Sequence, residues 1–346
     1  MSASSVHQSA DKRENDGRGE QDAPRQTLVR MSYLDAIVQA QIEELERDER
    51  VILMGEDIEV YGGGKIVGRF DSTRVWNVPI SETSFTGVGV GAAITGLRPI
   101  VDLSIASFMY LASDPIINQA AKLRYMTGGQ IQVPIVFRCC MYYGMSIAAQ
   151  HSDRPYPAFM NTPGLKIVCA ASPGDIKGLM KSAVRDDDPV MIFEDAKLWA
   201  TKGDVPTDPN YLIPIGKADV KKVGTDVTVV AIAGAMRPVL EAEKVLSKEG
   251  ISIEVIDPRT LKPLDLETIV SSVAKTGRLL LVENAHRMCN VSAEIAAGVC
   301  EVAFDSLKQP ILRLCAPDVH VPFSPALEAA LYPTNVDIIA AVKKLL

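Results

Sequence analysis

Short apolar runs alternate with helix-like stretches along most of the chain. In the first half, the runs at residues 51–54, 133–137, 166–170 and 190–193 are typical of strands that are buried on both faces. Ser32 followed by Asp35, and Ser172 followed by Asp175, predict the capped starts of two helices. Strands that alternate with helices form mostly parallel sheets covered on both faces, so we predict an α/β fold.

The same alternation repeats in the second half. Strands are predicted at residues 227–233, 253–256, 279–282 and 311–314, with helices up to about residue 250, at 266–275, at 292–303 and up to residue 346. Between residues 201 and 212 the chain is rich in proline, glycine, aspartate and asparagine, which is typical of a domain boundary. We therefore predict two parallel-sheet α/β domains, residues 31–205 and 206–346, with right-handed crossovers.

The first thirty residues differ from the rest in composition. They contain almost no large apolar side chain and are rich in Ser, Asp, Glu, Arg, Gln and Gly, so burial cannot offset the entropy of ordering them. Residues 1–30 are therefore predicted to be a disordered extension. Its acidic residues, Asp11, Glu14, Asp16, Glu20 and Asp22, argue against an organellar transit peptide.

Composition and charge exclude several classes of function. A net charge of −7 argues against a nucleic-acid partner, because phosphate binding needs a concentrated basic surface. No apolar run reaches the roughly 18 residues that span a bilayer. The six cysteines form no CxxC pair and have no histidine at ligand spacing, so we expect reduced thiols and a cytoplasmic protein, with an organellar matrix as the alternative.

Glu82 is the most informative polar residue. It lies between Ile80 and Phe85, where a strand is expected to end and a tightly packed helix to begin. That helix carries closely spaced glycines, at Gly87, Gly89, Gly91 and Gly96. A poorly solvated carboxyl group at this place is suited to hydrogen-bond a ring nitrogen and to exchange a proton. The alternative is a helix-entry glutamate that backbone amides stabilise.

Motifs along the chain extend this interpretation. They are GEDIEVYGG from Gly55, PISETSFTGVGVGAAITGLRPI from Pro79, AAQHSD from Ala148, KSAVRDDDPV from Lys181, DPRTLKPLD from Asp257 and APDVHVPFSP from Ala316. In this order, over about residues 30–346, the chain resembles the beta subunit of the thiamine diphosphate-dependent E1 component of 2-oxo acid dehydrogenase complexes, the pyruvate, branched-chain and acetoin group. The resemblance implies a transketolase-like pyrimidine-binding domain followed by a transketolase C-terminal-like domain.

The resemblance also implies roles for single residues. Glu82 would hydrogen-bond the aminopyrimidine ring of thiamine diphosphate, and Ile80 and Phe108 would contact the same ring. His151 would bind the 2-oxo acid or the intermediate at the mouth of the active site and assist reductive acylation of lipoate. Core packing is the alternative for Phe108, and a structural role is the alternative for His151.

A monovalent-cation site is a further implication. In the resembled family, potassium is bound by backbone and carboxylate oxygens at positions that match Ile117, Ala183, Val184, Asp186 and Asp188. The alternative is a solvated acidic turn after a helix. Of the remaining histidines, His286 is expected near the active-site channel and His320 to be structural.

The diphosphate-binding motif of the family is absent. In place of GDG followed by paired Asn, the chain has PGD at Pro173 and KGD at Lys202, and it has no GxxxxGK[ST] loop. We therefore expect thiamine diphosphate to be shared with an alpha subunit that holds Mg²⁺, in an α2β2 heterotetramer. The further partners implied are a 2-oxo acid and a lipoyl acyltransferase E2.

Two segments that would border the acyl pocket depart from the family pattern, so the sequence does not determine the size of this pocket or the exact substrate. The chain has CCMYYGM at residues 139–145 in place of a Gly/Pro-rich loop, and SDRPYPAFMNT at residues 152–162. Cys139 and Cys140 are an inert apolar pair or a redox-sensitive one. We expect an E1 beta subunit; the alternatives are a two-component thiamine diphosphate-dependent carboligase of secondary metabolism and a non-catalytic scaffold, against which the presence of Glu82 and His151 argues.

Overall fold

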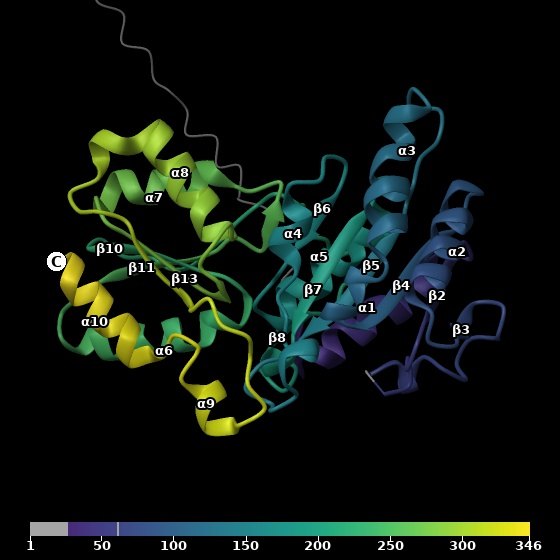
Figure 1. The fold of residues 1–346 in the computed structure, drawn as a ribbon, viewed down its shortest axis with the longest axis horizontal. Helices are drawn as coiled ribbons and strands as arrows, with labels where there is room; N and C mark the ends of the chain where they lie inside the picture. Colours follow the sequence, from purple (N-terminus) through teal and green to yellow (C-terminus); the bar gives the residue numbers. More distant parts are fainter. Residues whose placement is uncertain (1–26, 61) are drawn as a thin grey trace, which may run out of the picture.

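A seven-stranded sheet forms the first half of the computed structural model, which describes residues 27–60 and 62–346 (Figure 1). Its strands lie in the order β12-β6-β7-β5-β4-β2-β3 and are parallel, except that β12 runs antiparallel to β6. The strands are β2 (Val51–Gly55), β3 (Val75–Asn77), β4 (Arg98–Ile105), β5 (Val136–Met141), β6 (Lys166–Val168), β7 (Val190–Asp195) and β12 (Thr260–Lys262).

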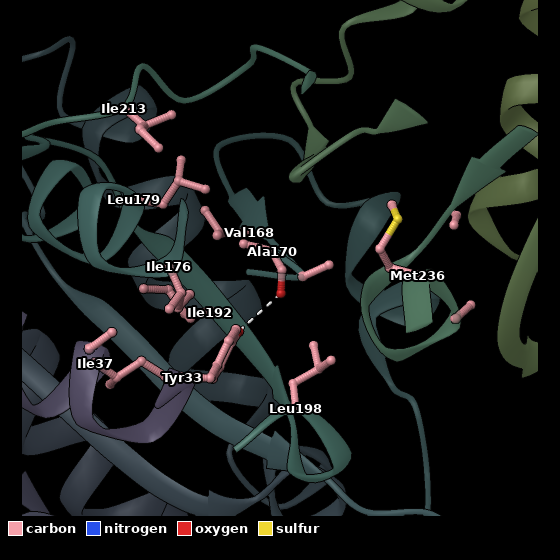
Figure 2. Packing of buried hydrophobic residues seen from close by; sticks show 14 of the residues in the cluster. Tyr33, Ile37, Val168, Ala170, Ile176, Leu179, Ile192, Leu198, Ile213 and Met236 are labelled. Atoms are coloured by element: carbon pink, nitrogen blue, oxygen red, sulfur yellow. Dashed lines mark hydrogen bonds between the residues drawn. The ribbon is translucent and has the colours of Figure 1, made fainter. Parts of the chain in front are cut away.

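Helices cover both faces of this sheet. On one face lie α1 (Tyr33–Arg47) and α5 (Pro173–Arg185), and on the other lie α2 (Glu82–Ile94) and α3 (Ala121–Met126). Ser32 and Ser172 cap α1 and α5 as predicted, because their side chains accept hydrogen bonds from backbone N–H groups three residues on. Tyr33, fully buried in the first core cluster, donates a hydrogen bond of 3.0 Å to the carbonyl oxygen of Ala170 (Figure 2).

A second, five-stranded sheet follows, in the order β14-β13-β10-β11-β9. Only β9 runs antiparallel to its neighbour. The strands are β9 (Asp219–Lys222), β10 (Val227–Ala231), β11 (Ile253–Asp257), β13 (Leu279–His286) and β14 (Leu312–Ala316). In Figure 1, α7 (Leu266–Thr276) and α8 (Val291–Ala303) lie on one side of this sheet, and α6 (Met236–Lys248) and α10 (Asn335–Leu345) lie on the other. The short helix α9 (Pro325–Ala329) precedes α10.

The α/β architecture with two mainly parallel sheets is confirmed, and three details differ from the predictions. Strand β1 (Leu28–Ser32) pairs antiparallel with β8 (Lys202–Pro206), so residues 28–30 of the predicted extension belong to a strand; residues 1–26 lie outside the described residues. The polar stretch after residue 201 thus begins with a strand. Strand β12 comes from the second half of the sequence but completes the first sheet. The exact division after residue 205 stays a prediction.

Two hydrophobic clusters run through the whole described structure. One contains residues of α1 and α5 together with Val227, Met236 and Leu345, and the other contains residues of α2 together with Val230 and Ile295. Each cluster therefore joins both sheets, which ties the positions of the two halves to each other. Among the described residues, no helix is long and apolar enough to cross a membrane.

Candidate active site

The start of α2 places Glu82 in a buried position. Glu82 is the first residue of this helix, and only 6% of it is exposed. The hydroxyl of Thr83 donates a hydrogen bond of 2.5 Å to the carbonyl oxygen of Leu111, which joins the start of α2 to the turn after Phe108. Gly89 lets the helix approach β4, because a Cβ atom at that position would lie 2.6 Å from Cγ2 of Val101. The close packing expected of this helix is confirmed at Gly89.

A second carboxyl group, Glu56, lies near Glu82. It follows β2 directly and is 2% exposed, and neither of its carboxylate oxygens has a hydrogen-bond partner in the part of the chain that the structure describes. Burial, and then the nearby charges of Glu82, Asp57 and Asp102, raise the pKa of Glu56 to about 7. Sequence reasoning missed this residue, although it lies in the GED motif, because its neighbour Glu82 is 26 residues away in the sequence.

Three further buried charged residues, Asp102, Arg138 and Glu194, link the central strands of the first sheet. Arg138 on β5 forms ion pairs with Asp102 on β4, at 2.5 Å, and with Glu194 on β7. Burial alone would lower the pKa of Arg138, but the two carboxylates raise it, so the guanidinium stays charged. Trp199 donates a hydrogen bond of 3.0 Å to Glu194. The strands β4, β5 and β7 are thus joined by charged side chains, and one of these, Asp102, acts on the pKa of Glu56.

His151 and Phe108 come together in the structure. Phe108 belongs to the short helix Ala106–Tyr110 and His151 to the short helix Ala149–His151. Their rings meet edge to face, with centroids 5.4 Å apart and planes at 81°. Phe108 also packs against a small buried cluster of Ile105, Cys140 and Tyr142, whereas Ile80 is 76% exposed. The roles expected of Ile80, Phe108 and His151 stay predictions.

Cys139 and Cys140 are buried on β5. They are 1% and 2% exposed, and burial, followed by the charge of Glu194, raises the pKa of both thiols well above its usual value. A buried thiol that stays protonated is a weak nucleophile. These observations favour the inert apolar pair over the redox-sensitive one.

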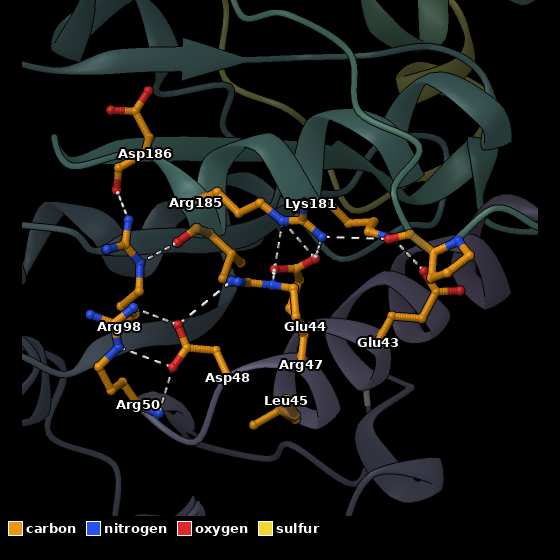
Figure 3. Close-up of polar contacts among 12 residues, drawn as sticks. Glu43, Glu44, Leu45, Arg47, Asp48, Arg50, Arg98, Lys181, Arg185 and Asp186 are labelled. Atoms are coloured by element: carbon orange, nitrogen blue, oxygen red, sulfur yellow. Dashed lines mark hydrogen bonds and ion pairs between the residues drawn. The ribbon is translucent and has the colours of Figure 1, made fainter.

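Two of the five residues expected to bind potassium, Ala183 and Val184, lie in the last turn of α5, and a third, Asp186, is the C-cap of this helix. The guanidinium of Arg98 donates hydrogen bonds to the carbonyl oxygens of Val184, at 2.9 Å, and of Asp186, at 2.8 Å (Figure 3). The ammonium of Lys166 lies 2.7 Å from both carboxylate oxygens of Asp186. Cationic groups of the chain therefore already bind these oxygens, so an added potassium ion would have to compete with them.

The other potassium candidates are spread more widely. Asp188 forms ion pairs with Arg124 and Lys166, whereas Ile117 lies in the π-helical segment Asp114–Ala120 and packs against the cluster on the α2 face. Among the described residues, no group of three or more His, Cys, Asp or Glu side chains is placed to hold a metal ion. The potassium site stays a prediction.

The two histidines of the second half occupy different environments. His286 ends β13; its Nδ1 lies 2.8 Å from the carbonyl oxygen of Pro317, and the residue lines a small cavity together with Ser152 and Arg154. It is therefore close to the segment that carries His151. His320 is exposed in the loop before α9.

Family models match both halves of the chain. Residues 29–200 match the pyrimidine-binding domain of transketolase, and residues 216–338 match the transketolase C-terminal domain. A solved chain described as "Split gene transketolase, inactive beta4 tetramer" has the same fold, with a TM-score of 0.74, 24% identity and coverage of 91% of this chain and 98% of that chain. The fold is thus that of the transketolase-like α/β proteins.

Relatives of known function define the family more narrowly. The beta subunit of acetoin:2,6-dichlorophenolindophenol oxidoreductase from Bacillus subtilis (strain 168) is 43% identical over 333 residues, which cover 91% of this chain and 97% of the relative. The mitochondrial beta subunit of the pyruvate dehydrogenase E1 component from Bos taurus is 43% identical over 327 residues, covering 92% and 91%. The 2-oxoisovalerate dehydrogenase subunit beta from Bacillus subtilis (strain 168) is 41% identical over 322 residues, covering 91% and 98%.

The chain therefore belongs to the E1 beta-subunit family of the 2-oxo acid dehydrogenases, which are thiamine diphosphate-dependent oxidoreductases. The relatives are named as beta subunits, which indicates an enzyme built from more than one kind of chain.

The residues of this chain fit one end of that cofactor. The buried carboxyl group of Glu82 suits a ring nitrogen, and the ring of Phe108 suits a planar heterocycle. The exposed Ile80, two residues before Glu82, can add an apolar contact. The phosphate end of the cofactor needs a metal site, for which the chain has no GDG motif.

Proposed function

We propose that this chain is the half of an E1 enzyme that holds and activates the aminopyrimidine end of thiamine diphosphate. The observation that carries the proposal is the buried pair of Glu82 and Glu56 beside the elements that carry Phe108 and His151. When bound, the cofactor supplies the carbon that adds to a 2-oxo acid and the electron sink for release of CO2. Glu82 holds a proton at the pyrimidine nitrogen.

Glu56 supports Glu82 through its own protonation. With a pKa of about 7, Glu56 is protonated in about half of the molecules at neutral pH. Two buried carboxyl groups that are close together do not both ionise readily, so the charge of Glu82 is one of the causes that keep a proton on Glu56. Because Glu56 titrates near pH 7 in the same buried site, it can take up or release a proton during the reaction.

His151 acts later in the proposed reaction. Its ring is held edge-on by Phe108 and is only partly buried, so it remains accessible to a substrate. In this proposal the imidazole binds the carboxylate of the 2-oxo acid and then donates a proton to the sulfur that leaves when the dithiolane of lipoate opens. The acyl acceptor is the lipoyl group of an E2 acyltransferase.

The diphosphate and its Mg²⁺ belong to an alpha subunit in this proposal, and two copies of each chain form the α2β2 enzyme. Support comes from the missing GDG motif and from relatives named as beta subunits of enzymes that act on pyruvate, 2-oxoisovalerate and acetoin. The substrate is proposed to be acetoin or a 2-oxo acid of about the size of pyruvate or 2-oxoisovalerate. Potassium is proposed as an additional ligand at the end of α5.

One observation favours a second candidate, a two-component carboligase. The loop after β5 carries Tyr142 and Tyr143, whose rings pack against Trp199 and Tyr332. In this proposal the loop borders the acyl pocket, and it is bulkier than the Gly/Pro-rich loop that most members of the resembled family have at this place. A carboligase would transfer the acyl unit to an aldehyde and would not use lipoate.

Calorimetry and isotope exchange test the proposal. The isolated chain should bind thiamine diphosphate with Mg²⁺ very weakly, whereas its mixture with the alpha subunit should bind it tightly. In the complex, Glu82→Gln should slow C2 hydrogen–deuterium exchange of the bound cofactor by orders of magnitude, while Glu59→Gln, at an exposed carboxylate three residues after Glu56, should not. Tight binding by the isolated chain, or exchange at the wild-type rate in Glu82→Gln, would refute it.

Acceptor assays separate the two candidates. An E1 enzyme acylates a lipoyl domain, and His151→Ala should reduce that activity more than the reduction of an artificial dye. If the wild-type complex acylates no lipoyl domain and instead joins the acyl unit to an aldehyde, the carboligase is the correct assignment.

A further inference from the structure

The segment between β5 and His151 has an unusual backbone. Gly144, Ser146 and Ala148 have φ angles of 60°, 58° and 63°, in the left-handed region. Glycine adopts this conformation readily, but serine and alanine do so only when their surroundings hold them there. The path of the chain into His151 therefore depends on contacts from outside the segment.

Helix α9 of the second half provides one such contact. Glu328 on α9 is fully buried, and its two carboxylate oxygens accept hydrogen bonds from the backbone N–H groups of Gly144, at 2.5 Å, and Ser146, at 2.9 Å. Each of these N–H groups belongs to a residue in the left-handed region. Hydrogen bonds to a carboxylate are stronger than those between neutral groups, so this contact can stabilise the strained backbone.

An aromatic stack next to α9 holds the same segment. The rings of Tyr143 and Tyr332 meet edge to face, with centroids 5.0 Å apart. The guanidinium of Arg154 lies 4.4 Å from the ring centroid of Tyr143 and 5.2 Å from that of Tyr332. The chain is therefore attached to the second half on both sides of His151, at Tyr143 before it and at Arg154 after it.

We propose that Glu328 is a positioning residue for His151. It fixes Gly144 and Ser146, and His151 follows Ser146 by five residues. The catalytic histidine of the first half thus depends for its position on a carboxylate of the second half. The kinetic consequence rests on the function proposed for His151, whereas the structural contact does not.

Hydrogen exchange of the purified full-length chain tests the contact itself. In Glu328→Ala, amide exchange in residues 144–151 should rise by about 10-fold or more, and the rest of the chain should be unchanged. Glu328→Gln, which keeps the shape and one accepting oxygen, should give a smaller increase in the same residues. Glu301→Ala, at an exposed glutamate of α8, is the matched control and should change nothing there. Unchanged exchange in residues 144–151, or increased exchange throughout the second half, would overturn the proposal.

Kinetics of the complex with the alpha subunit test the positioning. Glu328→Ala should slow acyl transfer by about 10-fold or more in the wild-type background. In the His151→Ala background it should slow acyl transfer by less than about 2-fold, because the contribution of His151 is already lost there. C2 exchange of the bound cofactor should stay at the wild-type rate, since Glu82 lies elsewhere. Equal losses in both backgrounds, or a parallel loss of C2 exchange, would show a general structural role and overturn the proposal.

The two measurements also separate the proposals from each other. If His151→Ala transfers acyl groups at the wild-type rate, the role proposed for His151 is wrong, and the kinetic part of this inference is wrong with it. The exchange measurement would still decide whether Glu328 holds the segment.

Discussion

Replacement of Glu56 by glutamine should change how the stability of the protein depends on pH. Burial and the neighbouring carboxylates raise the pKa of Glu56 from 4.5 to about 7, so the native state holds this proton more tightly than the unfolded state does. Between these two pH values the native state binds more protons, and the free energy of unfolding therefore falls as the pH rises. The stabilising contribution of the protonated group is complete below pH 4.5 and is lost by about pH 7 to 8.

The size of the effect follows from the shift. A pKa of 4.5 in the unfolded state and of about 7 in the native state corresponds to a change of at most about 3 kcal/mol in the free energy of unfolding. Glutamine cannot ionise, so Glu56→Gln removes this pH dependence while it keeps the shape of the side chain. The stability of the variant relative to the wild type should therefore rise by about 2–3 kcal/mol between pH 4.5 and pH 8.

Urea unfolding at a series of pH values measures this difference. Both tryptophans, Trp76 and Trp199, lie within residues 29–200, which match the pyrimidine-binding domain. Trp76 pairs with Met54 on the strand that leads to Glu56, so tryptophan fluorescence reports on the relevant sheet. Glu59→Gln, at an exposed position, is the control and should follow the wild type. Parallel curves for the wild type and Glu56→Gln between pH 4.5 and pH 8 would refute the reasoning.

Three further predictions concern packing and charge. Gly89→Ala should destabilise the protein by about 1–3 kcal/mol and weaken cofactor binding, whereas Gly87→Ala, which faces open space, should be neutral or stabilise the isolated chain by up to about 1 kcal/mol in urea unfolding. Arg138→Met should lower the free energy of unfolding by about 3–5 kcal/mol, because it leaves two buried carboxylates unpaired; a loss below about 1 kcal/mol would contradict this. KCl should raise the melting temperature more than NaCl does, and this difference should be larger in Lys166→Met than in the wild type, because the substitution frees the oxygens of Asp186. An equal difference in wild type and variant would argue against a potassium site.

Local patterns in the sequence predicted much of the fold. Apolar runs predicted β2, β5, β6 and β7 of the first sheet and β10, β11, β13 and β14 of the second, and Ser32 and Ser172 predicted two helix starts, because capping and strand burial depend on residues close together in the chain. The short edge strands β1, β9 and β12 were not predicted, since an edge strand of three to five residues has little apolar pattern of its own. The central strand β4 was also missed, because Pro99 and Asp102 interrupt its apolar run. The motif around Glu82 pointed to a buried carboxyl group at the start of a helix.

The tertiary structure alone decided which distant residues meet. Glu56 becomes a neighbour of Glu82 only when β2 and α2 pack together, and its pKa is raised by that burial. Glu328 reaches Gly144 across 184 residues of sequence, and β12 joins a sheet whose other strands all precede it in the chain. Such contacts depend on how the two halves pack against each other through shared hydrophobic clusters, which is a property of the whole packed chain. The helices and strands themselves are determined by their own side chains.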